Sequence, residues 1–342
     1  MTAFTVGLPE VIAGIMLAAL NAYVLTGGAD YGGGVWDLLA SGPSRDDQRS
    51  LIEQSIAPIW EANHVWLIVV VVLLFSAFPA AFGMLGVVLH IPLSVMLIGI
   101  VLRGSAFVFR SYGGPDRGRR WGIVFAVTSL VTPVILGMII GAVVSDRVGE
   151  ASARIGDASF ADVFVRSWLS SFTTLVGLFA LALFAFLAAT YLTVAADTDV
   201  LRAVFRRRAI GAAIVVFVLA GLALAVSFQT APRVARGVAG ASWSMPLHAV
   251  TGLAALVAIA ALWRRRYRVA RVAAGAQVSL VLWGWAFAQV PFIVPPTLTI
   301  RGAASPRETL ILLLVGLCAG FIILIPSLRY LYRTFARASD HP

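Results

Sequence analysis

The chain has 342 residues, of which 60% are hydrophobic and only 12% are charged, and its mean hydropathy is +0.93. A water-soluble domain of this size has no use for so much apolar surface, so the composition excludes a soluble enzyme and indicates a polytopic membrane protein. The net charge is +10, and every basic residue is arginine. These arginines stand in short clusters between apolar runs, which is typical of cytoplasmic loops and not of nucleic-acid binding.

Nine apolar stretches are long enough to cross a bilayer, which takes about 20 residues. They are residues 8–27, 52–77, 79–110, 121–144, 162–194, 206–228, 247–265, 270–290 and 308–334. We therefore expect an all-α polytopic membrane protein that forms a single membrane domain over residues 1–342. Within it we expect a first four-helix unit (8–144), a second four-helix unit (162–290) and a peripheral ninth helix (308–334).

Arginine marks alternate loops, and this pattern predicts the orientation. The rich clusters lie at 45–49, 110–120, 202–208, 264–271 and in the C-terminal tail, whereas the loops between them are poorer in arginine. The positive-inside rule then places the N-terminus outside and the C-terminus in the cytoplasm of a bacterial plasma membrane. The first stretch lacks a basic region and a cleavage site, so we expect the first helix to be retained. Cys318 is the single cysteine, which excludes an internal disulfide.

The stretch from Glu53 to Trp66 contains two carboxylates and an imidazole directly before an apolar run. It leads without a helix breaker into an apolar run, and as one helix it places Glu53, Trp60, Glu61 and His64 on one stripe. Ionisable side chains in such a helix are costly and are functional candidates. Glu61 lies ~12 Å deeper than Glu53 at the helical rise, where loss of hydration favours the protonated carboxyl and allows proton exchange near neutral pH. The alternative is a buried polar network that only holds helices together.

Five glycines surround Asp30 between Gly27 and Gly34. They allow either a close backbone approach or a left-handed turn. The stretch is neither a phosphate loop nor a dinucleotide fingerprint, because it lacks the Lys-Ser/Thr ending and a preceding strand. Asp30 could admit protons or cap a neighbouring helix.

His90 and Arg103 are two further polar positions in the apolar stretch 79–110. Pro92 frees a carbonyl one turn back, so we expect His90 to be a hydrogen-bonded histidine at a kink, with haem ligation as the alternative. Arg103 and Arg110 could pair with carboxylates or extend toward the interface, and we expect pairing for Arg103 because it lies deeper. Four scattered histidines and one cysteine do not form an intrinsic multi-haem or copper centre, so no metal site is predicted.

Two motifs carry a family resemblance. The stretch Ser55–Ile68, with Trp60-Glu61-Ala62-Asn63-His64 at its centre, resembles the second-helix signature of subunit II of cytochrome bd quinol oxidase. Asp30-Tyr31-Gly32-Gly33-Gly34 resembles the first-helix motif of that family. The resemblance implies a non-haem subunit of an oxidoreductase complex that oxidises quinol and reduces dioxygen to water with cytoplasmic protons. The chain by itself is then not catalytic.

The resemblance also implies roles for particular residues. The protonatable carboxylate of the family falls on Glu61, which agrees with the position expected from the residues. The expected proton path at Glu61, Asp30, His64 and Glu53 adds to it three groups that rest on the residues alone. Contacts with the partner or its cofactors are expected at Trp60, Asn63, Trp66 and Arg103. Many relatives carry an acid where this chain has Gly27, so no role is transferred to that position.

Haem b and haem d are expected in the partner, subunit I, and not on ligands of this chain. The resemblance is further compatible with a structural quinone, a small accessory subunit and bound lipids. Two other classes compete with this interpretation: a proton-coupled transporter or channel that uses Glu61 and His64, and a purely structural membrane partner. A transporter built from paired repeats would show broken helices in both halves, whereas glycine and acid crowd only the first half here.

Overall fold

The computed structural model describes residues 6–56, 60–112 and 114–338, which form fourteen helices and one two-stranded hairpin. The helices are α1 (Leu8–Leu38), α2 (Arg45–Ile56), α3 (Trp60–Ala77), α4 (Pro79–Val88), α5 (His90–Tyr112), α6 (Gly114–Val144), α7 (Arg147–Ala153), α8 (Phe160–Phe164), α9 (Ser171–Ala195), α10 (Asp199–Thr230), α11 (Pro232–Gly240), α12 (Ser244–Trp263), α13 (Tyr267–Gln289) and α14 (Arg307–Ala338). The antiparallel hairpin pairs β1 (Phe292–Val294) with β2 (Leu298–Thr299) and connects α13 to α14.

Eight of these helices are long and apolar enough to cross a membrane, and α3 with α4 makes a ninth candidate that bends by 114°. For the part of the chain that the structure describes, this confirms an all-α membrane protein with about nine spans. The bend follows from the sequence, because Pro79 has no backbone N–H and stands at the first position of α4.

The predicted span 79–110 is wrong as a single helix. It is divided at Leu89 into α4 and α5. Pro92 cannot donate a hydrogen bond to the carbonyl four residues earlier, which weakens the helix at this point. The Nδ1 atom of His90 lies 2.9 Å from the carbonyl oxygen of Val87, which confirms the hydrogen-bonded histidine at a kink.

The predicted span 162–194 is wrong at its start, since α9 begins only at Ser171. A reciprocal cap sets this boundary. The Ser170 hydroxyl accepts the backbone N–H of Thr173 at 3.3 Å, and the Thr173 hydroxyl accepts the backbone N–H of Ser170 at 2.9 Å. Such a capping box satisfies two of the free N–H groups at a helix start.

Two further boundaries differ from those expected. α1 does not end near residue 27 but continues through the glycine-rich stretch to Leu38. The predicted helix 52–77 is described as two helices, with Glu53 on α2 and His64 on α3. Residues 57–59 between them lie outside the described part of the chain.

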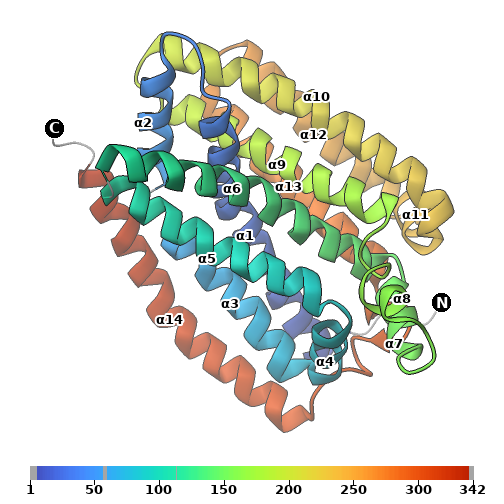
Figure 1. Ribbon diagram of the computed structural model, residues 1–342. Helices are drawn as coiled ribbons and strands as arrows, with labels where there is room; N and C mark the ends of the chain where they lie inside the picture. The colour runs from blue at the N-terminus through green and yellow to red at the C-terminus, as the bar shows by residue number, and fades with distance from the viewer. Residues whose placement is uncertain (1–5, 57–59, 113, 339–342) are drawn as a thin grey trace.

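α9 is the central helix of the bundle (Figure 1) and packs against α1, α6, α10 and α13. It is the most enclosed of the candidate spans, with 61% of its apolar window buried. α14 is the opposite case, since it packs mainly against α1 and α3 and only 6% of its window is buried. The grouping into two four-helix units and a peripheral helix stays a prediction.

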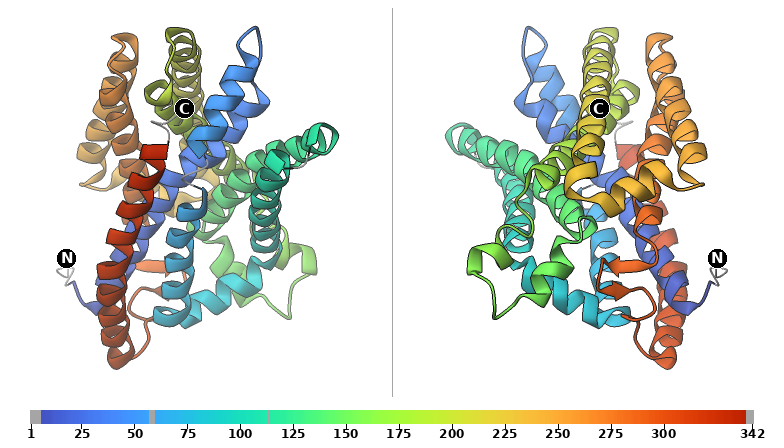
Figure 2. Two further views of the ribbon diagram at one scale, coloured as in Figure 1. Left: turned by 90° about the vertical axis from the view of Figure 1, so that its left-hand side faces the viewer. Right: turned by 90° about the vertical axis from the view of Figure 1, so that its right-hand side faces the viewer.

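The connections between helices lie at two opposite ends of the molecule. The α1–α2, α9–α10 and α12–α13 connections and the end of α14 lie at one end, which we call the Arg-rich end (Figure 2). The start of α1, α4, α7, α8 and the hairpin lie at the other end. The loops that the arginine pattern assigns to one side of a membrane therefore share one end of the fold.

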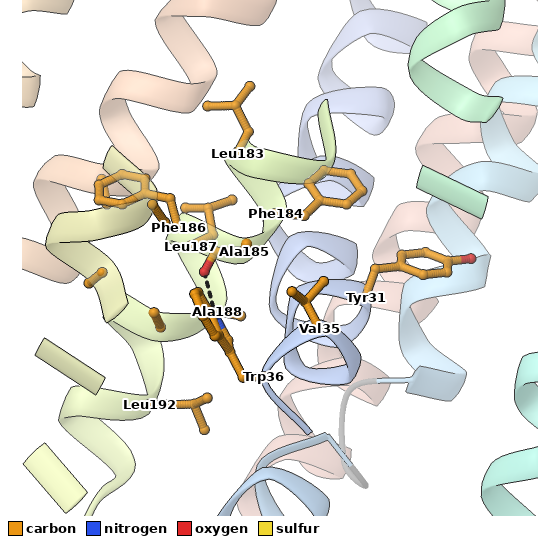
Figure 3. Packing of buried hydrophobic residues seen from close by; sticks show 14 of the residues in the cluster. Tyr31, Val35, Trp36, Leu183, Phe184, Ala185, Phe186, Leu187, Ala188 and Leu192 are labelled. Atoms are coloured by element: carbon orange, nitrogen blue, oxygen red, sulfur yellow. Dashed lines mark hydrogen bonds between the residues drawn. The ribbon is translucent and has the colours of Figure 1, made fainter. Parts of the chain in front are cut away.

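The glycines of α1 allow it to lie directly against its neighbours. A Cβ atom on Gly32 would overlap the carbonyl oxygen of Phe184 on α9. No described glycine of this stretch has a positive φ, so the close backbone approach is confirmed and the left-handed turn is wrong. The indole N–H of Trp36 donates to the carbonyl oxygen of Ala185 at 2.8 Å in the same contact (Figure 3).

We expect Gly32→Ala to destabilise the protein, because its methyl group overlaps backbone that cannot move without separating α1 from α9. Overpacking of this kind typically costs about 1–3 kcal/mol. Gly211→Ala on α10 is the matched control, since nothing lies within 4 Å of its Cβ position. Thermal unfolding of the purified protein in detergent measures both, and equal melting temperatures would contradict the close crossing.

Candidate functional site

A fully buried ion pair joins three helices near the middle of the bundle. Arg103 on α5 is 3% exposed and Asp30 on α1 is 0% exposed. The guanidinium donates from Nη1 to Asp30 Oδ2 and from Nη2 to the Asp30 backbone carbonyl oxygen, both at 2.8 Å. Its Nε donates to the hydroxyl of Ser129 on α6 at 3.0 Å. This confirms that Arg103 pairs with a carboxylate.

Aromatic rings enclose the charge of Arg103. Its Cζ atom lies 4.8 Å from the ring centroid of Tyr31 and 4.7 Å from that of Phe125. The faces of these rings stabilise a cation where water is absent. The sequence suggested a proton carrier or a helix cap at Asp30, and the structure adds a role that was not considered, as the counter-ion of Arg103.

A second ion pair repeats the first one two helical turns further along. Arg110 donates to both carboxylate oxygens of Asp37, at 2.8 and 3.1 Å, and Arg49 Nε lies 3.7 Å from the same carboxylate. Each partner is seven residues beyond its counterpart in the first pair, so α1 and α5 run parallel and in register. Asp37 was not among the predicted site residues. The repeated seven-residue spacing on both helices was the signal that could have found it.

A small crevice opens beside this second pair. It is lined by Asp37, Ile52, Glu53, Ile56, Phe107, Arg110 and Phe125. Glu53 is half-buried on α2, and its negative charge acts on Arg110. The crevice therefore places the Glu53 carboxylate next to the ion pair that is closer to the Arg-rich end.

α3 presents two polar side chains to the same region. Asn63 is fully buried, and its Oδ1 accepts a hydrogen bond from the hydroxyl of Thr26 at 2.6 Å. His64 is half-buried, and the charges of Asp30 and Arg103 both act on it. The structure thus brings His64 and Asn63 to the face of α1 that carries the buried ion pair.

The remaining predicted site residues lie further out or outside the described part. The Trp66 ring stacks on Phe321 of α14, with 6.4 Å between ring centroids. The side chains of Trp60 and Glu61 lie outside the described residues, so the position expected for the Glu61 carboxyl stays a prediction.

The described histidines do not gather into a metal site. Within residues 6–56, 60–112 and 114–338, no group of three or more His, Cys, Asp or Glu side chains could hold a metal ion. His90 and His248 each place a ring nitrogen within hydrogen-bonding distance of a backbone carbonyl oxygen, at 2.9 and 2.8 Å.

Comparisons with known proteins give one consistent result. The family described as cytochrome bd terminal oxidase subunit II matches residues 8–335. A Bacillus subtilis (strain 168) protein with the provisional name cytochrome bd menaquinol oxidase subunit II is 24% identical over 321 residues, covering 92% of each chain. Cytochrome bd-I ubiquinol oxidase subunit 2 of Escherichia coli (strain K12) is 30% identical over 125 residues, covering 36% of this chain and 32% of that protein.

A solved structure shares the fold. A chain of the bd oxidase from Geobacillus thermodenitrificans superposes with a TM-score of 0.79 at 21% sequence identity. The match covers 96% of this chain and 98% of that chain. The whole bundle, and not only the motif-bearing first half, is therefore common to both.

We expect Arg103→Gln to destabilise the protein by about 3–5 kcal/mol, because it leaves the buried Asp30 carboxylate without its counter-ion. Arg202→Gln removes the exposed ion pair with Asp199 and should cost about 0–1 kcal/mol. Thermal unfolding measures both variants. The double variant Asp30→Asn/Arg103→Gln should lose less stability than the two single variants Asp30→Asn and Arg103→Gln lose together. If the two losses simply add, the two residues are not coupled.

Proposed function

Because this chain belongs to the family of cytochrome bd terminal oxidase subunit II, we propose that it is the haem-free subunit of a bd-type quinol oxidase in the bacterial plasma membrane. The complex oxidises quinol and reduces dioxygen to water. This chain contributes a scaffold and a path for proton uptake. Haem b and haem d belong to subunit I in this proposal.

One observation carries the proton path: the ionisable residues of α1, α2, α3 and α5 are concentrated on one side of the bundle, starting at the Arg-rich end. The positive-inside rule places that end in the cytoplasm. Glu53 lines the crevice there, next to the pair of Asp37 and Arg110. Protons enter at Glu53 in this proposal and continue along α3.

The buried ion pair acts on the path without carrying the proton. A proton on Asp30 would leave Arg103 as an uncompensated charge in an apolar interior, which is costly. His64 lies close enough to this pair for both of its charges to act on the imidazole. We therefore assign Glu53, Glu61 and His64 as the proton-carrying groups, and Asp30 with Arg103 as the pair that balances the charge around them.

The partner has to lie where protons leave the path. Large apolar side chains are exposed along α3 and α14, including Phe75 at 60% and Ile322 at 75%. We propose that subunit I covers these two helices, because its oxygen-reducing centre then lies beside α3. A small accessory subunit or a structural quinone can add to this assembly, and the described residues assign neither.

Glu61→Gln should lower the oxygen-uptake rate of the purified complex by roughly tenfold or more, since the amide cannot relay a proton. Glu150→Gln on the exposed surface of α7 at the opposite end is the matched control. The reduced-minus-oxidised haem spectra of both variants should equal that of the wild type. Wild-type turnover in Glu61→Gln, with the haem spectrum unchanged, would end the proposed path while leaving the assembly intact.

The single cysteine, Cys318, is exposed on α14 and can test the partner surface. In membranes that contain the whole complex, a benzophenone maleimide on Cys318 should cross-link to subunit I. Phe217 is 80% exposed on α10, so Cys318→Ser/Phe217→Cys provides a control that should label lipid and not subunit I. Cross-linking to subunit I from position 217 alone would place the partner on the wrong face.

A further inference from the structure

The turn between α12 and α13 carries a group of arginines that the proposed oxidase function does not use. Five of the eight residues from 264 to 271 are arginine, and all five are exposed. We call Arg264, Arg265, Arg266, Arg268 and Arg271 the α12–α13 arginine cluster. The turn lies at the Arg-rich end of the molecule (Figure 2).

The backbone reverses direction inside this cluster. The N–H of Arg264 donates to the Ala260 carbonyl at 2.9 Å and that of Arg266 to the Ala261 carbonyl at 2.8 Å. Arg265 between them has a φ of 56°, which is uncommon for a residue with a side chain. A tight turn therefore concentrates five positive charges in a small area.

No acidic side chain neutralises this charge. Within the described part of the chain, none of the five arginines has a carboxylate within 4.0 Å. Asp199, at the start of α10 and at the same end of the molecule, is paired with Arg202 at 3.2 Å. Arg271 lies over the ring of Tyr191, 4.9 Å from its centroid, which leaves its charge in place. Such an uncompensated patch attracts anions.

The opposite end of the fold is built differently. Arg233 there is paired with Asp146 and Arg166 with Asp162, at 3.0 and 2.6 Å. Arg301 at that end is likewise paired with Glu10. The α12–α13 cluster is distinguished by its density, since it holds five exposed arginines within eight residues.

Apolar side chains flank the cluster on both helices. Trp263 at the end of α12 is 68% exposed, and Val269 and Val272 at the start of α13 are 47% and 73% exposed. Tryptophan is enriched at the level of lipid headgroups. A ligand that covers both kinds of surface must combine an anionic group with apolar chains, which a water-soluble anion does not.

We propose that the α12–α13 arginine cluster is a binding site for an anionic phospholipid. The guanidinium groups hold the phosphate of the headgroup, for which their planar donors are suited. Trp263, Val269 and Val272 contact the glycerol backbone and the first part of the acyl chains. The site anchors the second half of the bundle to the anionic leaflet, away from the proposed proton path.

Native mass spectrometry of the whole detergent-purified complex, titrated with dioleoylphosphatidylglycerol, tests the proposal. Arg264→Gln/Arg266→Gln/Arg268→Gln should weaken lipid binding by about fivefold for each arginine removed. Arg154→Gln/Arg236→Gln/Arg307→Gln removes the same charge from exposed positions at the opposite end and should bind lipid as the wild type does. Oxygen uptake of both variants reports that the complex is intact.

Three outcomes would overturn the proposal. The first is equal phosphatidylglycerol binding by the cluster variant and the wild type. The second is an equal loss in the control variant, which would show a response to net charge alone. The third is displacement of the lipid by millimolar inorganic phosphate with Trp263→Ala binding as the wild type, which would indicate a site for a water-soluble anion. Dioleoylphosphatidylcholine should bind weakly to every variant.

Discussion

The ion pair of Arg103 and Asp30 is the interaction on which the first half of the bundle depends. Both side chains are buried among apolar helices, where an isolated charge is severely penalised. Each is acceptable only in the presence of the other, so α1 and α5 can assemble in one register and not in its neighbours. The hydrogen bond from Arg103 to Ser129 extends the same constraint to α6. The second ion pair and the Glu53 crevice then follow from the register, because Asp37 and Arg110 are offset by the same two turns.

Close packing around α1 makes this register possible. Helices in a membrane gain little from hiding apolar surface from lipid, so they associate through tight contacts between small residues. Gly32 admits the backbone of α9 at Phe184, Gly34 admits Ser129 of α6, and Gly27 leaves room for Asn63 of α3. Replacement of these glycines would push apart the helices that the ion pairs hold together. The glycine-rich stretch therefore permits the close helix packing that the ion pairs need in order to form.

The two halves of the molecule divide the work in the function that we propose. The first half gathers ionisable groups along α1, α2, α3 and α5. Together with the C-terminal helix α14, α3 exposes apolar surface for a partner subunit. Among the described residues the second half buries no charged side chain, and its densest group of exposed arginines lies at the α12–α13 turn. α9 connects the halves, since it packs on α1 and α6 as well as on α10 and α13. The ionisable groups of the first half are thus connected through the apolar helix α9 to the helices of the second half, which serve as a scaffold.

The sequence by itself determined the membrane class, about nine spans, the alternation of arginine-rich loops and the family motifs, because hydropathy, charge and short motifs are local properties. It also predicted a carboxylate partner for Arg103 and a hydrogen-bonded His90 at a kink, since polar side chains in an apolar stretch require partners. It did not show that α1 continues to Leu38, because glycine propensity argues against a helix unless neighbouring backbones demand one. The identity of Asp30 as counter-ion, the second pair through Asp37 and the approach of α9 to Gly32 were decided only by the tertiary structure. Each of these joins residues that are distant in the chain, and their pairing depends on helix register and packing that no local pattern records.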